Sequence, residues 1–302
     1  MTTIFLPPEE GFLGDRRAQD MALPLVRVIP FGLEATVSYG AGTAHGPAAM
    51  LTASQTLPLF DDESWSTPRE AFRLETIKEP QIATPVEAAL DQLAELTGAA
   101  LNEGAFPFVF GGEHAITPGA LRPFVKRWPE LTLLHFDAHA DLRDGYDGQH
   151  FSHAAALRRC LDHEGVSLVS IGIRNISAEE IPFYEANRHR IHIHWAKDKS
   201  DWRVEDIIAP LVGKYVYVTF DLDGFDASVM AATGTPEPGG FCWEGVLAIR
   251  GRGAGGYPVV GADINELAPQ PGLHSCDRLA AKLAYKILGY KFLSFSNFNK
   301  SA

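Results

Sequence analysis

The chain has 302 residues, of which 46% are hydrophobic and 21% charged, a composition that excludes collagen, coiled-coil and disordered proteins and is typical of a globular enzyme. Its 38 acidic and 26 basic residues give a net charge of −12, which disfavours nucleic acids and anionic membranes as partners because both attract basic surfaces. Three widely spaced cysteines, an N-terminus without a signal-peptide pattern and no apolar run near ~18 residues predict a cytoplasmic protein.

The first hundred residues combine turn-forming and helical segments. Residues 1–24 contain several prolines and are expected to form an N-terminal arm before the first strand. Residues 38–47 are rich in glycine and predict a loop with several turns. Residues 85–103 place apolar side chains at the spacing of one helix face, and Gly104 follows as a stop, so we expect a helix there.

Apolar strands alternate with helices along the rest of the chain. The expected strands are 25–30, 106–110, 131–136, 166–173, 191–195, 215–222 and 257–264. The expected helices are 85–103, 152–163 (with Ser152 as the N-cap), 177–188, 201–211, 242–250 and 275–289. Strands that are apolar throughout and alternate with helices predict an α/β fold with a mostly parallel sheet covered on both faces. No change in composition marks a linker, so we expect a single domain over residues 1–302.

Acidic residues and histidines follow four of the expected strands. The four groups are Glu113 with His114, Asp137 with His139 and Asp141, Asp221 with Asp223, and Asp263 with Glu266. Alternate side chains of an extended segment point to the same side, and the carboxyl ends of parallel strands form the usual ligand crevice. The sequence therefore predicts that one histidine, an Asp-x-His-x-Asp motif and an Asp-x-Asp motif converge at one edge of the sheet.

Such a group of side chains requires a cation, because four neighbouring carboxylates would otherwise repel one another and take up protons. An isolated Asp-x-Asp is usually a solvated turn, and a lone histidine is usually an ordinary loop residue. The combination at successive strand ends favours a metal site instead. Four carboxylates balance two divalent ions, and mixed carboxylate and imidazole ligands without thiolates favour Mn²⁺ over a structural zinc site.

Six segments of the chain resemble the ureohydrolase family, which contains arginases, agmatinases and related amidinohydrolases. They are GGEHAIT at 111–117, FDAHADLRD at 136–144, SHAAALRR at 152–159, FDLDGFDAS at 220–228, TGTPEPGG at 233–240 and DINELAP at 263–269. The segment EATVSYGAGTAHGP at 34–47 is similar to the agmatinase branch. These segments run in the order of the family over most of the chain.

The resemblance implies a three-layer α/β/α fold of the arginase type and two Mn²⁺ ions per chain. It assigns the first ion to His114, Asp137, Asp141 and Asp221, and the second to His139, Asp137, Asp221 and Asp223, with Asp137 and Asp221 as bridges. It also implies a homo-oligomer, either a trimer or a hexamer. Two positions depart from the family pattern without removing a ligand: Glu113 stands where Asp is commonest, and Ala227 stands where Pro usually follows Asp226.

The reaction implied by the resemblance is the hydrolysis of a guanidinium group to urea and an amine. Asp141 would accept a proton and pass it to the leaving amine. Glu266 would bind the guanidinium group, although a salt bridge at the strand end is its alternative role. His153 would relay protons to and from water, with packing at a helix start as its alternative.

Segment 142–150, LRDGYDGQH, bears on the substrate. It lacks the Asn- and Ser/Thr-rich stretch with which arginases bind the α-carboxylate and α-amino groups of their substrate. It offers the ring of Tyr146 and the carboxylate of Asp147 instead. We therefore expect a cationic guanidino substrate, agmatine or a compound with a similar tail, ahead of arginine, with guanidinobutyrate and guanidinopropionate as alternatives.

Two other classes of function remain open at this level. One is a homologue that binds metal without catalysis, and the other is a single-zinc hydrolase related to deacetylases, which would not need both aspartate motifs. Two further features carry less weight. The GxGxxG pattern at 251–256 precedes an expected strand instead of following one, which disfavours a nucleotide site, and His189, His192 and His194 lack neighbouring acids that would complete a metal site.

Overall fold

In the computed structural model, eight strands form one sheet in which every neighbouring pair is parallel. The structure describes residues 3–14, 20–211, 214–245 and 257–293. The strands are β1 (Leu25–Phe31), β2 (Arg73–Thr76), β3 (Phe106–Gly111), β4 (Thr132–Phe136), β5 (Ser167–Ile173), β6 (Ile191–Trp195), β7 (Val216–Asp221) and β8 (Val259–Asn265). Their order in the sheet is β2-β1-β3-β8-β7-β4-β5-β6, which confirms the predicted parallel α/β architecture.

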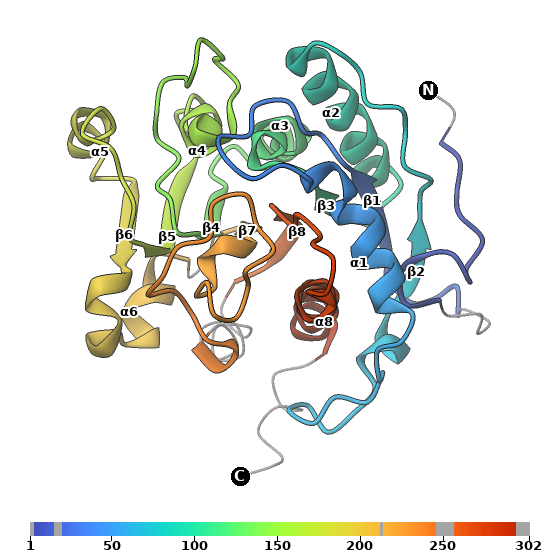
Figure 1. Cartoon of the computed structure of the whole chain (residues 1–302). Helices are drawn as coiled ribbons and strands as arrows, with labels where there is room; N and C mark the ends of the chain where they lie inside the picture. Colours follow the sequence, from blue (N-terminus) through green and yellow to red (C-terminus); the bar gives the residue numbers. More distant parts are fainter. Residues whose placement is uncertain (1–2, 15–19, 212–213, 246–256, 294–302) are drawn as a thin grey trace.

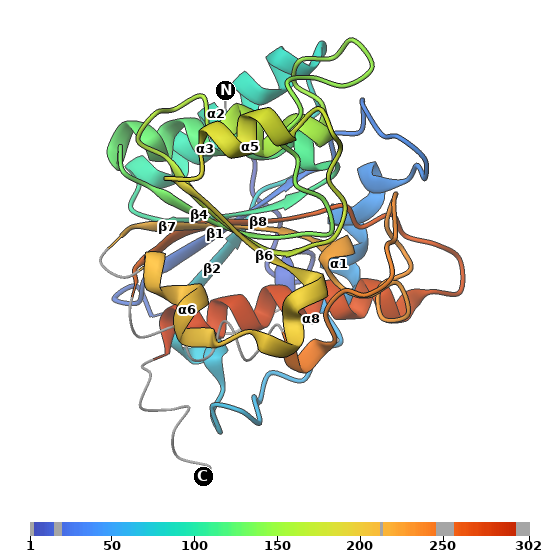
Figure 2. The same ribbon diagram turned by 90° about the vertical axis from the view of Figure 1, so that its left-hand side faces the viewer.

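Helices cover both faces of this sheet. They are α1 (Gly46–Ser54), α2 (Val86–Asn102), α3 (Thr117–Arg127), α4 (Ala156–Cys160), α5 (Ile181–Ala186), α6 (Val204–Ile208) and α8 (His274–Phe292). Figure 2 shows the sheet nearly edge-on, with α2, α3 and α5 on one side and α6 and α8 on the other. Helix α1 packs against α8, and α4 packs against α3. The predicted three layers are therefore present.

Several predicted elements differ from those observed. Helices α1 and α3 were not expected, because Gly46-Pro47 and Pro118 interrupt the local pattern; both prolines lie in the first helical turn, where the missing N–H does no harm. Strand β2 is only four residues long and was also missed. Three expected helices are shorter than predicted, and Ser152 caps a short 3₁₀ turn before α4 by accepting the Ala154 N–H at 3.3 Å. Most of the expected helix 242–250 and the whole GxGxxG pattern lie outside the described residues.

Apolar side chains from both faces of the strands hold the sheet rigid beneath the functional residues. On the α8 face, Phe136 and Phe220 from neighbouring strands stack with ring centroids 4.8 Å apart. On the α3 face, Phe124 meets Tyr217 edge-on at 4.9 Å. All four side chains are buried, so the carboxyl ends of the central strands are fixed in position.

None of the helices in the part of the chain that the structure describes combines the length and apolarity needed to cross a membrane.

Candidate metal centre

The predicted metal ligands and Glu266 follow the carboxyl ends of four strands that are adjacent in the sheet, β3, β8, β7 and β4 (Figure 1). His114 begins a 3₁₀ turn after Gly112 and Glu113, which follow β3, and Asp137 directly follows β4. Asp221 is the last residue of β7, and Asp223 lies in the 3₁₀ turn that follows. Segments far apart in the sequence thus deliver their polar side chains to one place, because parallel strands end at the same edge.

Three carboxylates surround one nitrogen of His114. Its Nδ1 atom lies 3.1 Å from Asp137 Oδ2, 3.2 Å from Asp141 Oδ2 and 3.2 Å from Asp221 Oδ2. All four side chains are buried. These are the four residues that the sequence analysis groups around a first ion.

A second group shares Asp137 with the first. His139 Nδ1 lies 2.9 Å from Asp223 Oδ2 and 3.5 Å from Asp137 Oδ1. Asp137, His139 and Asp223 have ligand atoms close enough together to hold an ion. Asp221 stands beside this group, since its Oδ1 accepts the Asp223 backbone N–H at 2.9 Å.

The Asp-x-His-x-Asp motif does not reach this arrangement as an extended segment, as the alternation argument assumed. The chain bends after Asp137, whose Oδ1 accepts the His139 N–H at 2.5 Å, and Asp141 has a positive φ of 54°. The Ala140 N–H donates to the Asn175 carbonyl, which ties the loop to the end of β5. The three side chains therefore meet because the loop curls, and not because of a strand repeat.

The electrostatics of the cluster favour the binding of a cation. Burial and the adjoining Asp223 and Asp137 raise the pKa of Asp221 well above its ordinary value. Burial and Asp137 raise the pKa of Asp141 to about 6. Burial alone would lower the pKa of His139, but Asp223 and Asp137 raise it to about 12. The protein thus favours extra protons where a divalent ion would supply the charge.

The state of His114 fits a metal ligand. Its Nε2 lies 2.8 Å from Thr219 Oγ1, whereas its buried Nδ1 has no hydrogen bond although three carboxylate oxygens stand around it. Two ligands that share an ion at about 2.1 Å and form a right angle lie about 3 Å apart, which matches the spacing of these atoms. A neutral imidazole that donates through Nε2 presents its Nδ1 lone pair to an ion.

Thr219 belongs to a buried chain of hydrogen bonds that ends on Asp263. Thr219 Oγ1 lies 3.2 Å from Thr117 Oγ1, which donates to Asp263 Oδ2 at 3.1 Å. Asp263 also accepts from Tyr217 at 2.9 Å and from Asn265 at 2.7 Å. The chain of hydroxyls leaves Thr219 free to accept from His114, so Asp263 lies within β8 as support for a ligand and not as a ligand itself.

We expect Thr219→Val to weaken binding of divalent metal by roughly 10–100-fold, because the His114 Nε2–H loses its acceptor and the ring can turn to the other tautomer. Titration with Mn²⁺ against a competing chelator measures this. Thr97→Val is the matched control, since Thr97 is equally buried but bonds only to helix carbonyls. An unchanged affinity for Thr219→Val would contradict the role of Thr219.

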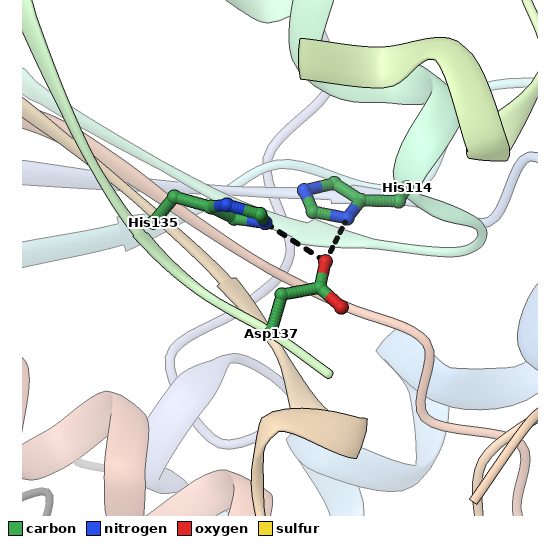
Figure 3. Close-up of side chains that lie close together, drawn as sticks. All are labelled: His114, His135 and Asp137. Carbon is green, nitrogen blue, oxygen red and sulfur yellow. Dashed lines mark hydrogen bonds and ion pairs between the residues drawn. The ribbon is translucent and has the colours of Figure 1, made fainter. Parts of the chain in front are cut away.

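His135 is a residue that the sequence analysis missed. Its Nε2 lies 2.8 Å from Asp137 Oδ2 and its Nδ1 lies 2.9 Å from Ser170 Oγ. Figure 3 shows Asp137 between His135 and His114, and these three residues also form a candidate metal-holding group. Its position two residues before Asp137, in an otherwise apolar strand, was the available clue.

Glu266 reaches the same edge from β8. It has a positive φ of 68°, and its buried Oε1 accepts the His114 backbone N–H at 2.6 Å. Burial, together with the charge of Glu113, raises its pKa to about 8. One carboxylate oxygen is thus used to fix the turn that carries His114, and Glu266 lines the cavity above the cluster.

His153 also lines this cavity, which has a volume of about 150 Å³. Its Nδ1 and Nε2 contact Thr36 and Ser38, and burial followed by the charges of His139 and His114 lowers its pKa to about 4. Tyr146 contributes to the wall, with its ring edge-on to His153 at 5.9 Å. Asp147 lies in the neighbouring turn and does not line the cavity. Of the two residues predicted to face the substrate tail, Tyr146 therefore lies at the cavity and Asp147 does not.

The three histidines set aside in the sequence analysis stay apart from this centre. His189 and His192 are exposed, and His194 packs edge-on against Trp202. Within the described residues, both groups of side chains that could hold an ion lie at the edge formed by β3, β7 and β4.

Comparison with known proteins gives a consistent result. The model of the arginase family matches residues 25–289. The N(1)-aminopropylagmatine ureohydrolase of Synechocystis sp. is 35% identical over 297 residues, 95% of each chain, and the agmatinase of Bacillus subtilis is 30% identical over 86% of this chain and 88% of its own. The crystal structure of agmatine ureohydrolase of Thermoplasma volcanium superposes with a TM-score of 0.78 at 28% identity, covering 89% of this chain and 90% of that one.

Proposed function

This chain belongs to the arginase family and is a ureohydrolase, and we propose that it hydrolyses the guanidinium group of agmatine, or of a related compound with a cationic tail, to urea and an amine. The observation that carries the proposal is that three aspartates, two histidines and Glu266 line one cavity, with the buried Asp137 in contact with both histidines. A deacetylase-type centre with one zinc ion would not need both aspartate motifs to be complete.

We propose that these side chains hold two divalent ions, with Mn²⁺ as the metal. His114, Asp137, Asp141 and Asp221 would hold one, and His139, Asp137, Asp221 and Asp223 the other. The grouping is supported by the contacts of His114 and His139 and by a donor set without thiolates. When bound, such a pair would lower the pKa of water toward neutrality and so supply a hydroxide nucleophile for the guanidinium carbon.

The residues around the ions have separate tasks in the proposed reaction. Glu266 binds the guanidinium group by accepting a charge-assisted N–H hydrogen bond at Oε2, because Oε1 already accepts the His114 N–H. Asp141 accepts a proton at Oδ1, since Oδ2 faces His114, and delivers it to the nitrogen of the leaving amine. His153, at the cavity wall, exchanges protons with water.

The substrate tail is proposed to be cationic. The cavity wall offers the ring of Tyr146 and the polar groups of Asn175 and Ser177. Agmatine is the first candidate, and N(1)-aminopropylagmatine is the second because the relative named for it matches 95% of this chain. Segment 142–150 lacks the Asn- and Ser/Thr-rich stretch with which arginases bind the substrate tail. Arg143 at the cavity wall is paired with Glu179 at 2.9 Å, which leaves the arginine less available to a substrate with a carboxylate tail.

Urea release from a panel of guanidines tests the substrate. We expect kcat/KM for agmatine or N(1)-aminopropylagmatine to exceed that for arginine, 4-guanidinobutyrate and 3-guanidinopropionate by at least about tenfold, the range of one lost ionic contact. A preference for arginine would overturn the assignment of the tail. Bound metal without urea from any guanidine would instead favour the non-catalytic homologue.

We expect His153→Ala to lower kcat by roughly 10²–10⁴-fold while both ions remain bound, because His153 moves protons and is not a ligand. Steady-state urea release and metal content by elemental analysis measure the two effects. His163→Ala, at an exposed position, is the control and should leave both unchanged. A normal kcat for His153→Ala would remove this role.

A single domain over residues 1–302, a trimer or hexamer, and a cytoplasmic location stay predictions.

A further inference from the structure

His153 is held through both ring nitrogens by hydroxyl groups of one loop. Its Nδ1 lies 3.1 Å from Thr36 Oγ1, and its Nε2 lies 2.6 Å from Ser38 Oγ. The His153 backbone N–H donates to the same Thr36 oxygen at 3.0 Å. Thr36 and Ser38 belong to the loop between β1 and α1, far from His153 in the sequence. This loop therefore fixes the orientation of the ring.

The buried carboxylate of Glu113 stands behind Thr36. Glu113 is 0% exposed, and its Oε2 accepts the backbone N–H groups of Ala35 at 3.0 Å and Thr36 at 2.7 Å. Its Oε1 accepts the Thr36 hydroxyl at 3.1 Å. All three donors belong to the loop. The loop can pass this close because Gly112 has no side chain: a Cβ there would lie 2.1 Å from the Leu33 carbonyl oxygen.

The count of protons on Thr36 decides the tautomer of His153. A threonine hydroxyl has one proton to donate and two lone pairs to accept. The Thr36 hydroxyl donates its one proton to Glu113 Oε1, so both contacts with His153 must be donated by His153. The nitrogen facing Thr36 therefore carries the proton. Ser152 Oγ, at 3.4 Å, is the more distant neighbour of that nitrogen and already accepts from Ala154.

We propose that Glu113, acting through the Thr36 hydroxyl, is a positioning residue that holds His153 in the Nδ1–H tautomer. The unprotonated Nε2 is then the basic nitrogen, and it faces Ser38, an exposed residue of the cavity wall. A proton arriving on Nε2 is thus one hydroxyl from solvent. This inference rests on the proposed function for its kinetic consequence, but the tautomer itself is a property of the folded chain.

Glu113→Gln is the decisive variant, because it reverses the hydrogen-bond chain without changing its size. The glutamine oxygen must still accept the Ala35 and Thr36 N–H groups, which turns the amide NH₂ toward Thr36 Oγ1. Thr36 then accepts from Gln and is free to donate to His153 Nδ1. We expect the proton of the neutral ring to move from Nδ1 to Nε2.

Nitrogen-15 NMR of the ring nitrogens reads the tautomer directly. The protein is loaded with Zn²⁺, a diamagnetic d¹⁰ ion, and His153→Ala identifies the resonances. In the unsubstituted chain we expect Nδ1 to be of the protonated type and Nε2 of the unprotonated type, and Glu113→Gln should exchange them. Thr36→Ser should keep the original pattern, whereas Thr36→Val should lose it. A protonated Nε2 in the unsubstituted chain, or no exchange in Glu113→Gln, would overturn the proposal.

Kinetics separate positioning from general damage to the fold. In the Mn²⁺-loaded enzyme, Glu113→Gln should lower kcat by roughly tenfold or more with KM and metal content little changed, since the wrong tautomer impairs proton transfer and not binding. In a His153→Ala background the same substitution should have no further effect. Glu79→Gln is the control, because Glu79 also accepts a backbone N–H, from Gly32, but does not contact Thr36.

If Glu113→Gln lowers kcat by the same factor in the His153→Ala background, the proposal is contradicted, because the loss of activity would then not depend on His153. Failure of the proposed function looks different: no guanidine would release urea from the unsubstituted enzyme, and the ring-nitrogen pattern would still report on the hydrogen-bond chain.

Discussion

Asp221→Asn is expected to lower the affinity for divalent metal by roughly 10²–10⁴-fold, the equivalent of about 3–5 kcal/mol, and to remove urea release with it. Asp221 is buried between the two groups of the centre, with Oδ2 at 3.2 Å from His114 Nδ1 and Oδ1 accepting from Asp223. Asparagine keeps the shape but replaces one oxygen by a donor and leaves the other uncharged, so one proposed ion loses a ligand atom and both lose the charge of the carboxylate.

The same substitution should have the opposite effect on the metal-free protein. Burial and the neighbouring carboxylates raise the pKa of Asp221, which means that its ionised form destabilises the folded chain when no cation is present. We therefore expect the Tm of the metal-free variant to equal or exceed that of the unsubstituted chain, whereas the increase in Tm on adding Mn²⁺ disappears.

Thermal unfolding with and without Mn²⁺, together with elemental analysis, measures both halves of this prediction. Asp277→Asn is a suitable control, since Asp277 is a half-buried carboxylate on α8 whose pKa is also raised by burial. It should leave the metal-dependent increase in Tm intact. An Asp221→Asn variant that still gains stability from Mn²⁺ as the unsubstituted chain does would show that Asp221 is not a ligand.

Glu266→Gln is expected to lower kcat/KM for the guanidine by roughly 10²–10³-fold while metal content stays normal. The amide oxygen can still accept the His114 N–H, so the turn after β3 is kept. The NH₂ group then faces the guanidinium group, which has only donors, and a buried charge-assisted pair is replaced by two opposed donors.

Urea kinetics with agmatine and the metal content of the purified variant are the measurements. A loss of metal would show that Glu266 acts on metal binding, by fixing the backbone of His114. A kcat/KM within threefold of the unsubstituted enzyme would exclude Glu266 from guanidinium binding. Either result is readily distinguished from the expected one, because the expected variant keeps its metal and has a greatly lowered kcat/KM.

Much of the fold and of the candidate site could be predicted from the sequence alone, because apolar runs and spaced polar motifs are features of short segments of the chain. Seven of the eight strands could be predicted from apolar runs. Acidic residues follow four of these strands, and they were expected to meet because parallel strands end at one edge of the sheet. The exceptions have local causes: α1 and α3 begin with prolines that imitate a loop, and β2 is too short to show a pattern. The side chains proposed as metal ligands were likewise visible as spaced motifs.

Only the tertiary structure decided how these side chains are held. The curl that carries Asp141 to His114, the support of His114 by Thr219, and the chain from Glu113 through Thr36 to His153 all depend on segments distant in sequence. Strand β8 comes last in the chain yet lies between β3 and β7, and no periodicity encodes that order. Hydrogen bonds need donors and acceptors within about 3 Å, and such proximity between distant segments exists only after the strands have assembled.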